Sequence, residues 1–275
     1  MSVDVSLDIH GVSKTYRVDG APLLALSDIR FAVEAGEFVT ILGASGCGKS
    51  TLLRLIIGLD TDYEGDILLD GHRIAGPGAD RGIVFQEPRL LPWLTIEQNV
   101  ALGLDAGGIP AAMSNRIAGE QLKRVRLAGF EQAYPHQLSG GMAQRAAIAR
   151  ALVSQPKILL MDEPLGALDS QTRAYMQDEL LRIWQREQIT MVMVTHDIEE
   201  AVYLGSKVVV MEPRPGRVRG ILPIEWPHPR DRHSPTFACV KGRVLQMLVK
   251  GGFDDTPAPL PSDDEGIRYP ALFGG

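Results

Sequence analysis

The feature that most constrains this chain is a glycine-rich segment at 43–51, between an apolar run at 38–42 and a helical-looking run at 52–57. The segment fits the pattern G-x-x-x-x-G-K-[ST], with a strand before it and a helix after it. Glycines let the backbone curl so that successive N–H groups point at phosphate oxygens, and the start of the helix adds the positive end of its dipole. The predicted phosphate-binding residues are Gly43, Ala44, Ser45, Gly46, Cys47, Gly48, Lys49, Ser50 and Thr51.

Two side chains of this segment carry more specific predictions. Lys49 is expected to reach the β- and γ-phosphates of a nucleoside triphosphate, and the Ser50 hydroxyl is expected to ligate Mg²⁺. The alternative is a glycine-rich turn that binds nothing, and the flanking strand and helix argue against it. The sequence therefore predicts that the chain binds a nucleoside triphosphate together with Mg²⁺.

Composition indicates a globular protein and excludes several classes. Hydrophobic residues make up 45% of the 275 residues, which is enough for a substantial core. The net charge of −6 shows no excess of basic residues that would attract nucleic acid, so we expect no nucleic-acid partner. The apolar runs have strand length and fall far short of the ~20 residues of a membrane-spanning helix. No secretory signal is recognisable, and with Cys47 and Cys239 as the only cysteines we expect the reducing cytosol.

Acidic and imidazole side chains follow two apolar strands. Asp162 and Glu163 come directly after the apolar run 157–161, and His196 follows the run 190–195. Parallel strands present their carboxyl ends to a ligand at one edge of a sheet. Asp162 is then expected to hold Mg²⁺ through its water shell, Glu163 to polarise an attacking water, and His196 to touch the γ-phosphate. The alternatives are a pair of acids that merely end a strand and a structural histidine.

Pattern elsewhere predicts the organisation of the domain. Alternating segments at 7–10 and 29–33 predict antiparallel strands. Tyr16, between them, is by its spacing a strand residue, and the other interpretation is an aromatic platform for a base. The stretch from about 95 to 152 has helical periodicity, and Ser139 before a helix at 142–153 fits an N-cap and a second anion site equally well.

Together these patterns predict an α/β fold: a P-loop NTPase core with an N-terminal antiparallel β-subdomain and an inserted helical subdomain at about 95–152. The pattern also predicts a closing hairpin after residue 207 and a short helix at 237–249. The remaining stretch, 251–275, is acidic and proline-rich, and we expect it to be a mobile tail.

The order of the motifs resembles the nucleotide-binding subunit of an ATP-binding-cassette (ABC) transporter. The resemblance implies an ABC ATPase domain that spans 5–250. The succession is the phosphate loop, a glutamine at a strand end, a Leu-Ser-Gly-Gly motif, the acidic pair, a Leu-Asp pair and a histidine. These motifs are Gly43–Thr51, Gln86, Leu138–Gly141, Asp162–Glu163, Leu168–Asp169 and His196.

The resemblance implies a role for each matching residue. Tyr16 is implied to stack on adenine, Gln86 to contact Mg²⁺ and the attacking water, Glu163 to be the general base, and His196 to hold the γ-phosphate. The resemblance therefore favours the aromatic-platform interpretation of Tyr16. It also places Asp169 at the interface between two cassettes.

The resemblance further implies that the signature residues Ser139, Gly140 and Gly141 complete the ATP site of a second copy, so that ATP joins two subunits. The family's signature usually ends in glutamine, where this chain has Met142. That departure leaves the three phosphate-contacting residues untouched.

A narrower resemblance links the chain to the nitrate/sulfonate/taurine import branch of the family. It rests on the segments 76–86, 90–95, 138–142 and 229–232. It implies an ATPase homodimer on the cytoplasmic face of the membrane, docked on separate permease subunits and served indirectly by a substrate-binding protein. The apolar loop 87–94 either receives a short helix of the permease or packs between the two subdomains.

Other functions stay open at this stage. A soluble ABC ATPase of DNA repair or ribosome function predicts long coiled-coil insertions or two cassettes in one chain, which the sequence lacks. A non-enzymatic ATP-sensing scaffold predicts a missing general base, whereas Glu163 is present. The cargo of an importer of this branch could also be a pyrimidine precursor, because no residue of this chain is expected to contact it.

Overall fold

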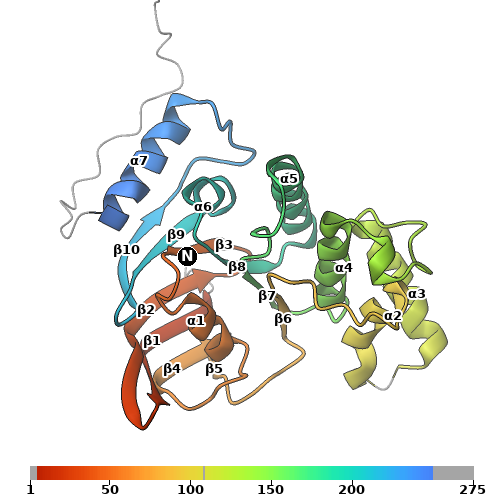
Figure 1. Ribbon diagram of the computed structural model, residues 1–275, viewed down its shortest axis with the longest axis horizontal. Coiled ribbons are helices and arrows are strands. Elements are labelled where there is room, and N and C mark those ends of the chain that lie inside the picture. The colour runs from red at the N-terminus through yellow and green to blue at the C-terminus, as the bar shows by residue number, and fades with distance from the viewer. Residues whose placement is uncertain (1–4, 108, 250–275) are drawn as a thin grey trace, which may run out of the picture.

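The computed structural model describes residues 5–107 and 109–249, which form two β-sheets with helices packed around them (Figure 1). One sheet is antiparallel, with the spatial order β2 (Ala21–Glu34), β1 (Val5–Val18), β4 (Glu64–Leu69) and β5 (His72–Arg73). The other has the order β10 (Arg217–Pro223), β9 (Lys207–Glu212), β3 (Phe38–Gly43), β8 (Thr190–Thr195), β7 (Ile158–Asp162) and β6 (Arg81–Val84). Only β10 runs antiparallel to its neighbour in this second sheet.

The second sheet is buried on both faces because its central strands are apolar throughout. All six residues of β3 and of β8 are buried. Successive side chains alternate between faces, so Phe38 and Met191 belong to one hydrophobic cluster, whereas Val39 and Val192 belong to the other. The sheet thus separates two cores.

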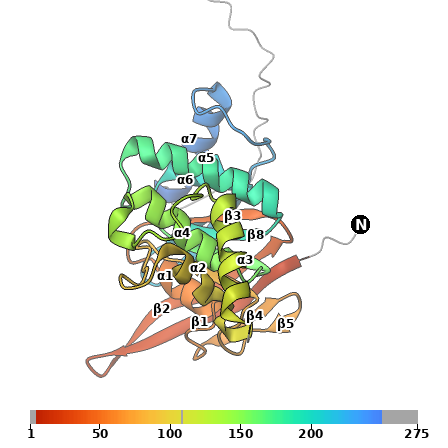
Figure 2. The same ribbon diagram turned by 90° about the vertical axis from the view of Figure 1, so that its right-hand side faces the viewer.

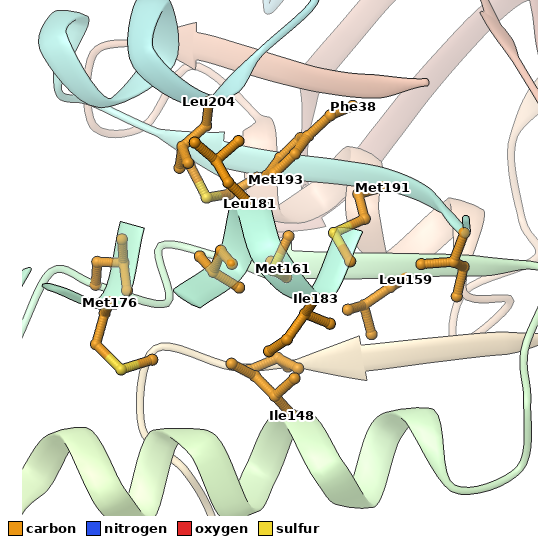
Figure 3. Close-up of a cluster of buried hydrophobic side chains, with 14 of the residues drawn as sticks. Phe38, Ile148, Leu159, Met161, Met176, Leu181, Ile183, Met191, Met193 and Leu204 are labelled. Carbon is orange, nitrogen blue, oxygen red and sulfur yellow. The ribbon is translucent and has the colours of Figure 1, made fainter. Parts of the chain in front are cut away.

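Each core is closed by different elements. The antiparallel sheet and α1 (Lys49–Ile56) cover one face. The other face packs against α4 (Gly140–Leu152), α5 (Ser170–Glu187), α6 (Ile198–Leu204) and α7 (Pro235–Val249). In Figure 3, side chains from β7 and β8 point toward Ile148 of α4 and Ile183 of α5, which fill the space between sheet and helices.

The predicted helical stretch forms a group of helices on one side of the sheets (Figures 1 and 2). Besides α4 it contains α2 (Ile96–Ala101), η1 (Leu102–Gly107), α3 (Ala111–Arg124) and η2 (Pro135–Gln137), where η marks a 3₁₀-helix. Thr95 starts α2 with a capping box: its side chain accepts from the Gln98 N–H, and the Gln98 side chain accepts from the Thr95 N–H. The α/β class and the helical character of this stretch are confirmed, and the domain bounds stay a prediction.

Several element boundaries differ from the sequence prediction: β1 and β2 extend well beyond the predicted 7–10 and 29–33, and two helices start earlier than predicted. The helix α4 begins at Gly140, two residues before the predicted start, because Ser139 caps it and both glycines enter the first turn. The last described helix starts at Pro235 rather than Phe237, since proline is well suited to the first turn of a helix.

The predicted acidic tail at 251–275 lies outside the described residues. Within residues 5–107 and 109–249, none of the helices combines the length and apolar character that crossing a membrane requires.

Candidate nucleotide-binding site

A cavity of about 870 Å³ lies where β3 ends and the phosphate loop, residues 43–48, leads into α1. Its walls come from β1, β2, the phosphate loop, α1, the ends of β6 and β7, and the turn after β9. The lining residues are Tyr16, Leu23, Leu24, Ala25, Ser45, Gly46, Gly48, Lys49, Ser50, Thr51, Gln86, Asp162, Glu163, Arg214 and Pro215. Most of the predicted ATP-binding and metal-binding residues therefore share one cavity.

The shape of the phosphate loop depends on glycine at particular positions. Gly48 precedes α1 with φ of 92°, in the left-handed region that side chains disfavour, and a Cβ there would lie 2.5 Å from the Leu26 side chain. Gly43 has no room for a side chain either, because a Cβ would lie 2.6 Å from the Cys47 sulfur. The Cys47 thiol is itself buried, which raises its pKa.

Lys49 and Glu163 of the cavity lining lie beside a third titratable group, His196, which is exposed and does not itself line the cavity. The buried Lys49 ammonium donates to the carbonyl oxygens of Gly43 at 2.8 Å and Ala44 at 3.2 Å, and it lies 3.5 Å from Glu163 Oε1. His196 Nδ1 lies 2.9 Å from the other carboxylate oxygen of Glu163. Glu163 also has a φ of 45°, a left-handed conformation that is uncommon for a non-glycine residue and typical of functional sites.

Asp162 and Ser50 form a second, adjoining pair. The Ser50 hydroxyl donates to Asp162 Oδ1 at 2.9 Å. Burial raises the pKa of Asp162, the hydrogen bond from Ser50 lowers it, and the nearby charge of Glu163 raises it further, with a net upward shift. Gln86 lines the same cavity, and a Cβ on Gly166 would lie 3.3 Å from its Nε2 atom. This set of hydroxyl, carboxylate and amide groups offers the oxygen ligands that Mg²⁺ prefers.

The structure tests one of the two interpretations of Tyr16, its place in a strand, and leaves a stacking contact with a base as a prediction. Tyr16 lies in β1, as its spacing predicts, and its ring lines the cavity. Its hydroxyl donates to Asp60 at 3.2 Å, and the Lys14 ammonium lies 4.8 Å from the ring centroid. Burial and the neighbouring Asp60 raise the pKa of Tyr16, which keeps the phenol neutral.

The signature residues do not line this cavity. Ser139 is exposed and caps α4 by accepting from the Met142 N–H at 3.3 Å, so the N-cap interpretation of Ser139 is observed. Gly141 lies against α5, where a Cβ would be 2.9 Å from the Thr172 methyl group. Ser139 and Gly141 border a different cavity of about 280 Å³ between α4 and α5.

Asp169 also has a clear structural role. It caps α5 by accepting from the N–H groups of Gln171 at 3.1 Å and Thr172 at 3.0 Å, and from the Thr172 hydroxyl at 2.6 Å. These hydrogen bonds, first of all the one from the hydroxyl, hold the pKa of Asp169 below its usual range. An interface role for Asp169 stays a prediction.

Five residues that line the cavity of about 870 Å³ were not predicted from the sequence: Leu23, Leu24 and Ala25 of β2, and Arg214 and Pro215 of the turn between β9 and β10. None belongs to a recognisable nucleotide motif. Their position depends on β9 pairing with β3 and on the turn after β9 reaching β2, and local sequence gives no signal for either.

The family model described as "ABC transporter" matches residues 26–166 of this chain, from β2 through the acidic pair. The chain belongs to the ABC transporter family. The predicted resemblance to a nucleotide-binding subunit of this family is thereby confirmed, and members of the family bind and hydrolyse ATP, so the chain is an ATPase.

Curated relatives align with this ATPase over most of its length. An uncharacterized ABC transporter ATP-binding protein of Methanocaldococcus jannaschii is 50% identical over 89% of the chain and 91% of its own length. The aliphatic sulfonates import ATP-binding protein SsuB of Bacillus subtilis is 44% identical over 91% of the chain and 95% of its own length. The name of SsuB describes a sulfonate importer, which agrees with the nitrate/sulfonate/taurine import branch that the motifs indicate.

Solved structures agree with the fold. One, described as the dimeric post-hydrolysis state of an ATP-binding cassette bound to ADP and Pi, is 35% identical with a TM-score of 0.70 and covers 80% of this chain and 99% of its own. Another, cbiO1 of Clostridium perfringens, is 30% identical with a TM-score of 0.72 over 81% of this chain and 90% of its own. The predicted P-loop ABC ATPase fold is confirmed.

Proposed function

We propose that this ATPase energises the import of aliphatic sulfonates, as a homodimer at the cytoplasmic face of the membrane that docks on separate permease subunits. The observation that carries the proposal is the placement of Glu163 between Lys49 and His196 beside the phosphate loop. The choice of cargo rests on the similarity to SsuB. A substrate-binding protein delivers the sulfonate to the permease and does not contact this chain.

Hydrolysis requires this chain to position ATP, a water molecule and Mg²⁺. Ser50, Asp162 and Gln86 have the oxygen groups that would hold Mg²⁺, which when bound neutralises charge on the phosphates. Lys49 exchanges its two carbonyl partners for phosphate oxygens. Glu163 accepts the proton of the attacking water.

His196 holds the carboxylate of Glu163 in place through Nδ1 and presents its other ring nitrogen to the γ-phosphate. Because a carboxylate only accepts, Nδ1 carries the proton between His196 and Glu163, and Nε2 needs a proton of its own to donate to a phosphate oxygen. Tyr16, which lines the same cavity, provides the flat surface for adenine.

The second ATP-binding surface comes from another copy of the chain. Ser139 and Gly141 border a cavity that shares no lining residue with the phosphate-loop cavity. In a dimer, Ser139 and the backbone N–H groups of Gly140 and Gly141 complete the partner's site at the start of α4. Phosphate release then removes the charge that joins the two copies, and the dimer opens.

The permease contacts the loop 87–94, which connects the nucleotide site to the helical group. Its backbone is fixed, since the Arg150 guanidinium donates to the carbonyls of Pro88 and Arg89, and Asn99 hydrogen-bonds to Leu91. Trp93 is nevertheless 69% exposed. An immobile loop that presents a large aromatic side chain suits a helix-in-groove contact with a membrane subunit.

The first test is capture of the partner. Tagged Glu163→Gln protein, which should hold ATP without turning it over, is purified with ATP from gently solubilised membranes of the source cell, and its partners are identified by mass spectrometry. We expect a polytopic permease. The matched Glu163→Gln, Trp93→Ala protein should recover much less of it while it still binds ATP. Recovery of ribosomes, DNA or nothing with the parent protein contradicts the transport role.

The cargo is tested separately by growth. Cells that lack this chain should fail to use an aliphatic sulfonate as their sulfur source and should grow normally on sulfate, and expression of the wild-type chain should restore growth. Normal growth on sulfonate in the deletion strain would exclude this cargo. Taurine, nitrate and a pyrimidine precursor are then tried in the same assay.

A further inference from the structure

The turn between β9 and β10, residues 213–216, forms a wall of the ATP cavity that no family motif describes. Arg214 and Pro215 of this turn line the cavity together with Ser45 and Gly46 of the phosphate loop. The sheet order explains the proximity. Because β9 is parallel to β3 and adjacent to it, the turn after β9 emerges at the same edge as the phosphate loop.

The turn is fixed directly against the phosphate loop. The Gly216 N–H donates to Ala25 O at 2.9 Å, and the Ser27 N–H donates to Gly216 O at 2.9 Å, which joins the turn to β2. A Cβ on Gly216 would lie 2.3 Å from the carbonyl oxygen of Cys47, so the two backbones are in close contact. The backbone two residues from Arg214 therefore cannot shift independently of the phosphate loop.

Arg214 is a cation at this cavity without a protein partner. Its side chain is exposed, and among residues 5–107 and 109–249 the structure gives its guanidinium no hydrogen bond or ion pair. Its φ of 64° lies in the left-handed region, which arginine rarely adopts. Such an outlier is a reason to look for a function.

The charge balance of the cavity favours an anionic ligand for Arg214. The charged residues among its lining are Lys49, Arg214, Asp162 and Glu163. Lys49 is committed to two carbonyl oxygens and lies 3.5 Å from Glu163. A nucleoside triphosphate brings several negative charges, and a guanidinium is well matched to phosphate oxygens because it can donate two parallel hydrogen bonds.

We propose that Arg214 is a nucleotide-binding residue that contacts the phosphate chain of ATP from the turn between β9 and β10. This inference rests on the proposed ATP site and adds to it a contact from a segment outside its motifs. It makes the turn a second source of positive charge at the cavity, in addition to the lysine of the phosphate loop.

The test measures the affinity of the full-length chain for ATP with Arg214→Gln, which keeps the length of the side chain and removes its charge. We expect roughly a tenfold loss of ATP affinity at low salt, in line with a charged hydrogen bond to phosphate. The loss should shrink at high ionic strength, because this exposed contact is screened. The control is Arg217→Gln, an exposed arginine of the same hairpin that does not line the cavity and should bind ATP like the wild type.

The outcomes separate this inference from the proposed site. If Lys49→Ala loses ATP and Arg214→Gln binds it like the wild type, the inference about Arg214 is wrong and the ATP site stands. A loss in Arg214→Gln that is equal for ATP and adenosine and insensitive to salt also overturns it, since the contact would then be to the base. Wild-type protein that binds no ATP would refute the proposed site itself. Thermal unfolding of each variant confirms that it folds.

Discussion

The proposed ATP site has two halves, the phosphate loop with its neighbours and the signature residues of a second copy. They differ in what their side chains bind when no nucleotide is present. In the phosphate-loop half, side chains are linked to one another: Ser50 to Asp162 at 2.9 Å, and His196 to Glu163 at 2.9 Å. In the signature half, Ser139 is exposed and its side chain caps its own helix. The side chains of the phosphate-loop half are thus arranged for a ligand. Ser139 of the signature half, in contrast, stabilises its own helix even when no ligand is bound.

The pKa values of Asp162 and Asp169 shift in opposite directions. Burial raises the pKa of Asp162, so its ionised form is disfavoured in the folded chain. Hydrogen bonds from Thr172 and Gln171 lower the pKa of Asp169, so its ionised form is favoured. A half-buried carboxylate kept at a cost in stability is typical of a functional site, and a capping carboxylate contributes to stability. Substitutions in the two halves should therefore separate activity from stability.

The largest effect is expected from Glu163→Gln in the phosphate-loop half. Loss of the general base should lower ATP turnover at least about a hundredfold and leave ATP binding intact, so that a dimer accumulates with ATP. Phosphate release measures turnover, and size-exclusion chromatography with ATP measures the dimer. Glu225→Gln, at an exposed position outside the cavity, serves as the matched control. Undiminished hydrolysis in Glu163→Gln would rule out this assignment.

The next largest effect is expected on binding. Lys49→Ala removes the buried ammonium of the phosphate loop and should weaken ATP binding about tenfold to a hundredfold. Titration with a fluorescent ATP analogue measures this loss, and Lys123→Ala on the exposed surface of α3 is the control. Wild-type affinity in Lys49→Ala would count against the role of the phosphate loop.

A pair of substitutions at Ser139 tests the dual role of the signature half. Ser139→Ala removes the cap of α4 and should lower the free energy of unfolding by about 1 kcal/mol. Ser139→Asp keeps a capping side chain and places a negative charge where the partner's phosphates are expected, so it should fold normally and fail to dimerise with ATP in the Glu163→Gln background. A normal ATP-dependent dimer with Ser139→Asp would show that the signature does not face phosphate.

The smallest effects are expected from replacing each aspartate with asparagine. Because the pKa of Asp162 is raised above 3.8 in the fold, its ionisation opposes folding as pH rises through that pKa, so Asp162→Asn should raise the Tm at neutral pH. Because the pKa of Asp169 is lowered, its stabilisation is present above 3.8 and is lost as pH falls through the lowered value.

Asp169→Asn should therefore lower the Tm slightly at neutral pH, and the difference from wild type should vanish on strong acidification. Calorimetry of the nucleotide-free proteins across pH measures both variants. Shifts of the same sign in the two variants would contradict the contrast between the halves.

The sequence was most informative where structure depends on neighbours in the chain. The phosphate loop, the apolar strand before Asp162 and the strand before His196 were all predicted, because glycine spacing and strand burial are local patterns. The N-cap interpretation of Ser139 was also accessible from the sequence, since N-capping involves a residue three positions away.

The sequence by itself thus determined the phosphate loop, the central apolar strands and the place of the acidic pair at a strand end, because the causes of these features lie within a few residues. Only the tertiary structure decided which distant segments share the cavity. Arg214 reaches the phosphate loop because β9 pairs with β3, and Gly216 lies against Cys47 about 170 residues earlier in the chain. Such proximity follows from the strand order of the whole sheet, which is set by the packing of both cores and leaves no mark on local sequence.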